Sequence, residues 1–383
     1  MRKLLFIIWL LLLVISLVAG CAADDGDGGV PSSVPAPAEA PSNGGTSSES
    51  SGLEGGRVSG SVGSGGSDAE EPDGAVSDSA GAEDDAQNEL YNELYNDSGL
   101  PVVFMTTEIT SESLVAIYRA LGAEPAGNIA IKVHTGEPPN SNYLRPELIG
   151  DLVRLIGGTI VETNAVAGQR ASNAKHMQVA KDHGFLDLAP FDLLDADGEV
   201  SIPISVGEVL DEVIVGVNVP NYNYYVVLSH FKGHGSAGYG GAIKNLSIGL
   251  ASAPGKSLIH SGGERRRGFS GNQERFLKGM AEASAGIVDY FDGNLLYINV
   301  MNRLSVDCDC MGNPAEPDMH DIGILASFDP VALDQACVDL VYAASDGASL
   351  IRRIEARNGI LTLEHAAAIG LGSREYVLVS IDD

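Results

Sequence analysis

Residues 128–164 decide the fold of this chain, and they read NIAIKVHTGEPPNSNYLRPELIGDLVRLIGGTIVETN. The apolar residues in 128–137 predict a strand that runs into a turn, and the prolines that follow require a loop. Residues 145–158 carry apolar side chains at helical spacing, with Pro146 in the first turn and Gly157 past the end. Residues 158–164 predict the next strand, so the stretch is a strand–helix–strand unit.

The same alternation continues on both sides of this unit. Further strands are predicted at 101–107, 201–205, 211–219, 222–230, 295–302, 321–329 and 375–381, and further helices at 111–121, 171–184, 242–250, 272–288 and 361–369, with one more beginning at Pro330. Strands separated by helices with short links favour a parallel sheet covered by helices. The sequence therefore predicts an α/β fold in three layers, as a single large domain. Ligands are expected beyond the carboxyl ends of its strands, near His134, residues 230–241 and Asp329.

The first residues have the pattern of a secretory signal. Arg2 and Lys3 precede a long apolar run, and residues 18–21 read VAGC. This ending resembles the lipobox of bacterial lipoproteins, which implies cleavage before Cys21 and a lipid on its sulfur. An uncleaved anchor helix is the alternative. Either interpretation places the protein at the cell membrane, facing outside the cytoplasm, with the membrane as a partner through the anchor.

Residues 22–98 are predicted to form a disordered, acidic linker rich in Gly and Ser, because they hold too few large apolar residues to offset the entropy of ordering. The predicted organisation is a lipoprotein signal peptide at 1–21, the linker at 22–98 and one α/β domain at 99–383. The formal net charge of −29 argues against nucleic acid as a partner, since so acidic a chain repels phosphate backbones.

Residues 226–256 concentrate polar side chains on a permissive backbone and read VVLSHFKGHGSAGYGGAIKNLSIGLASAPGK. Glycine lets a ligand approach the main chain closely, so we interpret 233–241 as a nest of backbone N–H groups for a carboxylate or phosphate. A tight structural loop is the alternative, and a dinucleotide site is disfavoured because no acidic residue closes a following strand. The ligand-binding candidates are Lys232, Gly233, Gly235, Gly240, Gly241, Lys244 and Asn245.

The candidates for acid–base chemistry are His134, His234 and Lys132. Lys132 and His134 are two positions apart, so a strand would direct both to the same face at its C-terminal end. The lysine is expected to lower the pKa of His134 and to favour its neutral, proton-accepting form. A structural or surface role remains the alternative for each histidine.

Residues 305–321 read SVDCDCMGNPAEPDMHD and place two thiols among carboxylates. Cys308 and Cys310, with Asp309 and His320 nearby, are candidate ligands for a divalent metal ion. Two reduced thiols or a strained disulfide are the alternatives. Cys337 falls at helical spacing with apolar residues and is predicted to be a packed core thiol.

Three blocks of the sequence, at 132–153, 229–256 and 308–341, resemble the domain of unknown function 362 family. The blocks occur in the family's order, and the similarity extends from Phe104 to the C-terminus. The resemblance implies an α/β fold. It also implies a set of motif positions, which are Lys132, His134, Lys232, His234, Gly240, Gly241, Lys244, Asn245, Cys308 and Cys310.

Members of this family are often labelled iron–sulfur centre proteins, and many carry a ferredoxin-like insert with paired four-cysteine runs. Residues 251–307 of this chain contain no cysteine. An all-cysteine [4Fe–4S] cluster needs four thiolates, and three cysteines remain beyond Cys21. A conventional cluster is therefore not expected in a monomer.

These observations lead to one functional hypothesis and two alternatives. We expect a lipid-anchored extracytoplasmic protein whose pocket binds a small anionic molecule, with a divalent metal ion as a candidate cofactor and with catalysis left open. The alternatives are a non-catalytic ligand-binding lipoprotein and an iron–sulfur redox protein that has lost its ferredoxin-like insert. The sequence indicates no particular protein partner.

Overall fold

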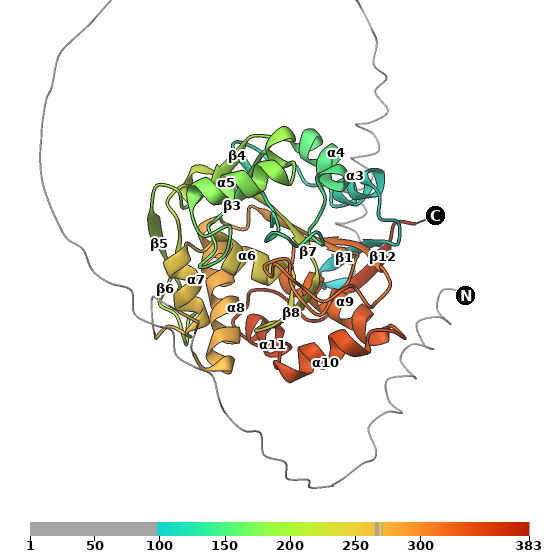
Figure 1. Ribbon diagram of the computed structural model, residues 1–383. Helices are drawn as coiled ribbons and strands as arrows, with labels where there is room; N and C mark the ends of the chain where they lie inside the picture. Colours follow the sequence, from blue (N-terminus) through green and yellow to red (C-terminus); the bar gives the residue numbers. More distant parts are fainter. Residues whose placement is uncertain (1–97, 265–267, 270, 383) are drawn as a thin grey trace, which may run out of the picture. The chain divides into compact units, whose positions relative to one another are not determined.

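The computed structural model describes residues 98–264, 268–269 and 271–382 (Figure 1). The predicted signal peptide with Cys21 and all but the last residue of the predicted linker lie outside these residues. Within the described part, no helix is both long enough and apolar enough to cross a membrane. The described residues cover nearly all of the predicted α/β domain.

The main sheet consists of β1 (Val102–Thr106), β2 (Ile129–Lys132), β3 (Thr159–Glu162), β4 (Phe191–Leu193), β7 (Tyr224–His230), β10 (Leu295–Met301), β11 (Gly323–Ser327) and β12 (Val377–Ser380). These eight strands lie in the order β12–β1–β11–β10–β7–β2–β3–β4. Neighbouring strands run parallel, except that β11 is antiparallel to both β1 and β10. The prediction of a mostly parallel α/β sheet is therefore confirmed.

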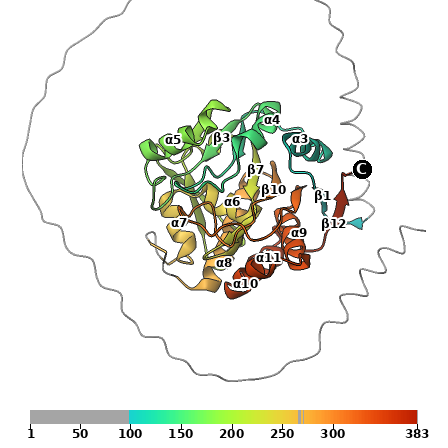
Figure 2. The same cartoon turned by 45° about the vertical axis from the view of Figure 1, so that its right-hand side comes forward.

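The helices are α3 (Ser111–Ala120), α4 (Pro146–Ile156), α5 (Asn173–Asp182), α6 (Ala242–Leu250), α7 (Ala253–His260), α8 (Gln273–Tyr290), α9 (Pro330–Ala343), α10 (Ala348–Ala356) and α11 (Leu361–Ala368), with short 3-10 turns η1 (Phe185–Asp187) and η2 (Val219–Asn221). They cover both faces of the sheet (Figures 1 and 2). One face packs on α3, α4 and α5, and the other on α6 to α11.

Strand β7 shows how the sheet joins the two helical layers. Its side chains alternate, so that Val226 and Leu228 pack in the cluster with α3 to α5, while Tyr225 and Val227 pack in the cluster with α6 to α11. All four are fully buried, and burying each side chain of this size contributes about 1.5–3 kcal/mol. The predicted three-layer architecture is confirmed.

Several helix ends agree with the sequence. Pro146 is at the first position of α4, and Gly157 ends that helix with φ 67 in the left-handed region, where glycine has no Cβ penalty. Asp329 caps α9 by accepting from the backbone N–H groups of Val331 and Ala332. The capping residue of α3 is Thr110, directly before the predicted start of this helix at residue 111.

Other elements differ from the sequence prediction. Strand β4 and helices α7 and α10 were not predicted, and β5 (Glu199–Pro203) pairs with β6 (Glu212–Gly216) in a separate two-stranded sheet. The glycine-rich segment is not a loop throughout, because β8 (Lys232–His234) and β9 (Gly238–Gly240) form an antiparallel hairpin. Since β11 is antiparallel, Asp329 lies at the opposite edge of the sheet from His134, and its expected place near the site was wrong.

Candidate functional site

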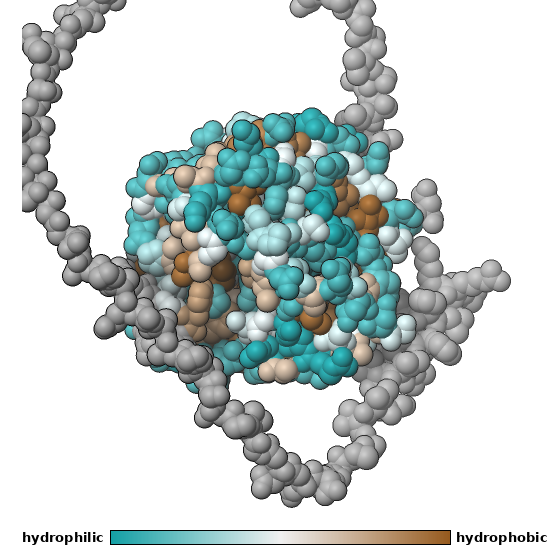
Figure 3. All heavy atoms as spheres, viewed as in Figure 1, coloured by the Kyte–Doolittle hydropathy of each residue, from teal (hydrophilic) through white to brown (hydrophobic). Residues whose placement is uncertain are grey.

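A cavity of about 410 Å³ lies beyond the carboxyl ends of β2, β3 and β7. The β8–β9 hairpin, α6, α7 and the loop through residues 308–310 complete its walls. On the face shown in Figure 3, apolar residues gather in a hollow near α6 and α7. The predicted residues that line the cavity are Lys132, His134, Lys232, His234, Gly240, Gly241, Lys244, Asn245, Cys308 and Cys310. Gly233 and Gly235 do not line it.

Lys132 is fully buried at the end of β2. Its Nζ donates to Val133 O at 2.6 Å and to Asn245 Oδ1 at 3.0 Å. The Asn245 amide is oriented by its own donation to Leu228 O at 3.1 Å. Burial lowers the pKa of Lys132 to about 8. The position of this amine also requires a glycine at residue 249, because a Cβ on Gly249 would lie 2.9 Å from Lys132 Nζ.

Two histidines present the same hydrogen-bonding pattern to the cavity. His134 Nδ1 accepts from Gly136 N at 3.1 Å, and His234 Nδ1 accepts from Ala237 N at 2.9 Å. Burial, followed by Arg170, holds the pKa of His134 well below its usual range; burial, followed by Lys244, does the same for His234. Each neutral ring therefore carries its proton on Nε2 and is a hydrogen-bond donor there.

This pattern corrects the expectation for His134. The predicted direction of its pKa shift was right, but Lys132 is the smallest of the causes and burial is the largest. The nitrogen that accepts protons is occupied by the main chain, so the free Nε2 donates. The ring is suited to polarising an oxygen of a ligand rather than to removing a proton from it.

Lys232 has a different environment from the other lysines of the cavity. Its Nζ lies 2.5 Å from Asp309 Oδ1 and 2.9 Å from Asn142 O, and the side chain is buried. The other oxygen of Asp309 lies 2.9 Å from His230 Nδ1. The positive charge of Lys232 is thus compensated within the protein, and the pair fixes the 308–310 loop against β8.

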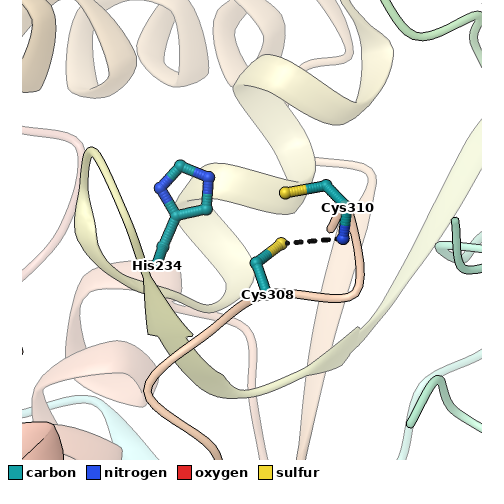
Figure 4. A group of neighbouring side chains, drawn as sticks. All are labelled: His234, Cys308 and Cys310. Atoms are coloured by element: carbon teal, nitrogen blue, oxygen red, sulfur yellow. Dashed lines mark hydrogen bonds between the residues drawn. The ribbon is translucent and has the colours of Figure 1, made fainter. Parts of the chain in front are cut away.

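Cys308 and Cys310 are free thiols beside His234 (Figure 4). The candidate ligand atoms of these three residues all lie within 4.8 Å of one another, so the group is compact enough to hold a metal ion. Figure 4 shows the Cys308 sulfur accepting from the Cys310 backbone N–H, at 3.2 Å. His320 is not part of the group, because it pairs with Asp346 at 2.7 Å.

The two thiols differ in acidity. A hydrogen bond from the Cys310 thiol, helped by Lys244, lowers the pKa of Cys308 to about 6, although burial opposes the shift. The same hydrogen bond raises the pKa of Cys310. Cys337 is a buried thiol packed in α9, as predicted, and accepts from Asn299 Nδ2 at 3.4 Å.

Some main-chain N–H groups in and beside the predicted nest at 233–241 are already used within the protein. Gly233 N donates to Ser305 O at 2.8 Å, and the first N–H groups of α6, from Ala242 and Ile243, donate to the carboxylate of Asp334. These three N–H groups are therefore not free for an anion, and the binding role of the other main-chain amides of 233–241 stays a prediction.

Sequence reasoning missed four ionisable residues of the cavity wall, Glu162, Arg170, Lys256 and His260. Glu162 ends β3 and pairs with Arg170 at 2.5 Å. The rule that polar side chains at carboxyl ends of parallel strands mark sites would have found Glu162. Nothing in the local sequence distinguishes Lys256 from a solvated lysine on a helix.

These features define an α/β domain with a cation-rich, ligand-sized cavity at one edge of its sheet. Residues 129–339 match the family model described as Domain of unknown function (DUF362), and the chain belongs to that family. No curated protein matches the chain.

Among the solved structures that are similar to this chain, two are described here. The lactate racemase apoprotein from Thermoanaerobacterium thermosaccharolyticum has 14% identity and a TM-score of 0.38, over 64% of this chain and 57% of that one. A structural genomics protein from Thermotoga maritima has 10% identity and a TM-score of 0.36, over 67% of this chain and 58% of that one. The chain thus spans less than two thirds of the length of either protein.

Proposed function

We propose that the cavity binds a small anionic molecule, such as a carboxylate or a phosphate. This proposal rests on the lysines of the cavity, three of which lack a carboxylate partner among the described residues. Lys132, Lys244 and Lys256 line the cavity, and within the described part of the chain none of them has a carboxylate oxygen within 4.0 Å. An anion is the ligand that supplies the missing partner.

Lys244 is the lysine best suited to meet the ligand. It lies in the first turns of α6 and is half-buried, and the described residues offer its amine neither a hydrogen bond nor an ion pair. Its charge is close enough to lower the pKa values of Cys308, His234 and His260. A local positive charge in a chain of net charge −29 also discriminates against cationic ligands.

The two histidines complete the proposed site. His134 and His234 would donate from Nε2 to oxygens of the anion, since their Nδ1 atoms are held by the main chain. If the ligand reacts in the cavity, these donors would stabilise negative charge on an oxygen. The site therefore supports a binding protein directly, and an enzyme through the same contacts.

Thermal unfolding in the presence of acetate, pyruvate and inorganic phosphate tests the proposal. At least one anion should raise the Tm of the wild type by linkage, and Lys244→Met should lose most of that rise. Lys175→Met is the matched control, because Lys175 is exposed on α5 and outside the cavity. Equal responses of Lys244→Met and the wild type would contradict the proposal.

A second candidate function is the binding of a soft divalent metal ion, which the group of His234, Cys308 and Cys310 favours. The two thiolates would supply the bonds to the ion. His234 fits this role poorly, because a ligating Nε2 requires a proton on Nδ1, where two backbone N–H groups already point. The thiols alone are therefore the proposed ligands.

We also propose that the protein is anchored to the membrane by a lipid on Cys21 and faces outside the cytoplasm. The basic start, the apolar run and the VAGC ending of the first residues support this location. Mass spectrometry of the N-terminal peptide of the protein purified from membranes tests it. The wild type should begin at Cys21 with a lipid on its sulfur, and a wild type that still begins at Met1 and carries no lipid would exclude this anchor.

A further inference from the structure

Lys256 lies on α7 with its amine at the wall of the cavity, between β3 and the α6–α7 turn. Its Nζ donates to Thr163 Oγ1 at 2.5 Å and to Ala251 O at 2.6 Å. The hydroxyl hydrogen of Thr163 is directed to the carbonyl oxygens of Gly249 and Ala251, each at 2.9 Å. The Thr163 oxygen therefore accepts from Lys256, and both contacts of the amine are acceptors.

Two acceptors are the number that a neutral amine requires. An uncharged lysine has two N–H groups and one lone pair, so the contacts to Thr163 and Ala251 leave the lone pair for the cavity. Lys232 provides the contrast, because its second acceptor is the Asp309 carboxylate, which favours the ammonium form. Among the described residues, no carboxylate lies within ion-pair distance of Lys256.

The surroundings of Lys256 make its neutral form accessible. Burial lowers its pKa to about 7, and the neighbouring positive charges of Lys132 and Arg170 add to the shift against the opposing carboxylates Asp195 and Glu162. The neutral form of Lys256 is therefore far more populated at neutral pH than that of an ordinary lysine, whose pKa is about 10.4. Lys132 is fully buried, while Lys256 is partly accessible, so Lys256 is the more accessible of these two low-pKa lysines.

We propose that Lys256 is a nucleophile that forms an imine with a 2-oxo carboxylate bound in the cavity. The inference rests on the proposed anion site, because the carboxylate of such a molecule would be held by Lys244. The ketone oxygen would meet a neutral imidazole donor, His134 or His234, which polarises the carbonyl. A single 2-oxo carboxylate would thus pair with the Lys244 ammonium, accept a hydrogen bond from a histidine and react with the lone pair of Lys256.

The step is balanced without a further reagent. The lone pair of Lys256 Nζ attacks the carbonyl carbon, and the carbonyl oxygen takes both protons of the amine and leaves as water. The products are one C=N bond between lysine and ligand and one water molecule. The histidines and lysines act as donors to the departing oxygen and are unchanged at the end.

Reductive trapping tests the imine. The purified full-length protein is incubated with pyruvate and sodium cyanoborohydride, and its intact mass is measured. The expected mass increase is that of pyruvic acid less one oxygen atom, located on Lys256 by peptide mapping. The rate of trapping should rise with pH through about pH 7, where the amine loses its proton.

Matched variants distinguish the nucleophilic role of the Lys256 amine from the effect of its positive charge. Lys256→Arg keeps a positive charge but has no nucleophilic amine at neutral pH, so the adduct should disappear. Lys175→Met should be labelled at the wild-type rate. Lys132→Met, which removes a neighbouring cation, should move the pH profile of trapping to higher pH.

Acetate, which has no carbonyl carbon open to imine formation, distinguishes failure of this inference from failure of the proposed function. A rise in Tm with acetate and pyruvate but no adduct would show that the anion site is right and the imine wrong. No rise with either anion and no adduct would overturn both. An adduct of equal yield in Lys256→Arg, or one located on another lysine, would also overturn the inference.

Discussion

The carboxylate of Asp334 on α9 accepts a hydrogen bond from Ala242 N, the first residue of α6, at 2.7 Å. It accepts a second from Ile243 N at 3.1 Å and a third from Asn299 Nδ2 at 2.7 Å. The start of α6 is therefore fixed by a residue outside the cavity. Since Lys244 and Asn245 follow immediately, this contact sets the position of two side chains of the proposed site.

The first prediction concerns Gly241, which precedes α6. A Cβ at Gly241 would overlap Asp334 Oδ1, and three hydrogen bonds hold that carboxylate in place. We expect Gly241→Ala to lower the free energy of unfolding by about 1–3 kcal/mol, measured by urea denaturation. Gly240→Ala is the control, because its Cβ would meet only the flexible Lys244 side chain, 3.3 Å away. If the two variants were equally stable, the contact with Asp334 would not be what fixes α6.

The second prediction tests whether Lys232 has a structural role. Lys232→Met would remove the ammonium partner of the buried Asp309 and leave its contact with His230. Removing one partner of a buried pair costs about 3–5 kcal/mol, so we expect a fall of this size in urea denaturation. Lys278→Met, which removes exposed pairs with Glu208 and Glu274, should change stability little. If the Lys232→Met protein were as stable as the wild type, Lys232 would have no structural role and would again be a candidate for binding the ligand.

The third prediction concerns the pH dependence of Cys308. Its pKa is lowered to about 6, so the thiolate should be populated above that pH rather than only above the ordinary pKa of a cysteine, 9.0. The rate of alkylation by iodoacetamide, followed by peptide mass spectrometry, should rise through about pH 6. Cys310→Ala removes the principal hydrogen bond and should move this midpoint upward. Cys337, fully buried in α9, should stay unmodified in the native protein.

Much of the fold was predictable because the apolar spacing in the sequence is strong. Helix α4 was predicted with both of its ends, since Pro146 and Gly157 have specific backbone requirements. The convergence of Lys132, His134 and Lys244 on one cavity follows from the parallel sheet, whose carboxyl ends meet at one edge.

The direction of β11 was not predictable in the same way. Its residues are apolar throughout, as in any buried strand, and the segment 302–322 before it carries no periodic signal of its direction. The hairpin of β8 and β9 was missed because glycines supply no alternating apolar side chains. The chemical role of Lys256 depends on Thr163 and Ala251, which only the tertiary structure brings to its amine.

The last prediction separates the anion site from the metal site at His234. The ring is held by Ser236 N and Ala237 N at Nδ1, at 3.2 and 2.9 Å, so its Nε2–H is available to an anion and not to a metal ion. His234→Gln should therefore reduce the rise in Tm with the most effective anion. It should leave unchanged the visible absorption of Co²⁺ bound by thiolates. Cys308→Ser with Cys310→Ser should do the opposite, abolishing the Co²⁺ absorption while the anion still raises the Tm. Loss of the Co²⁺ absorption in His234→Gln would instead mean that the imidazole ligates the ion and that its bonds to the hairpin break when metal binds.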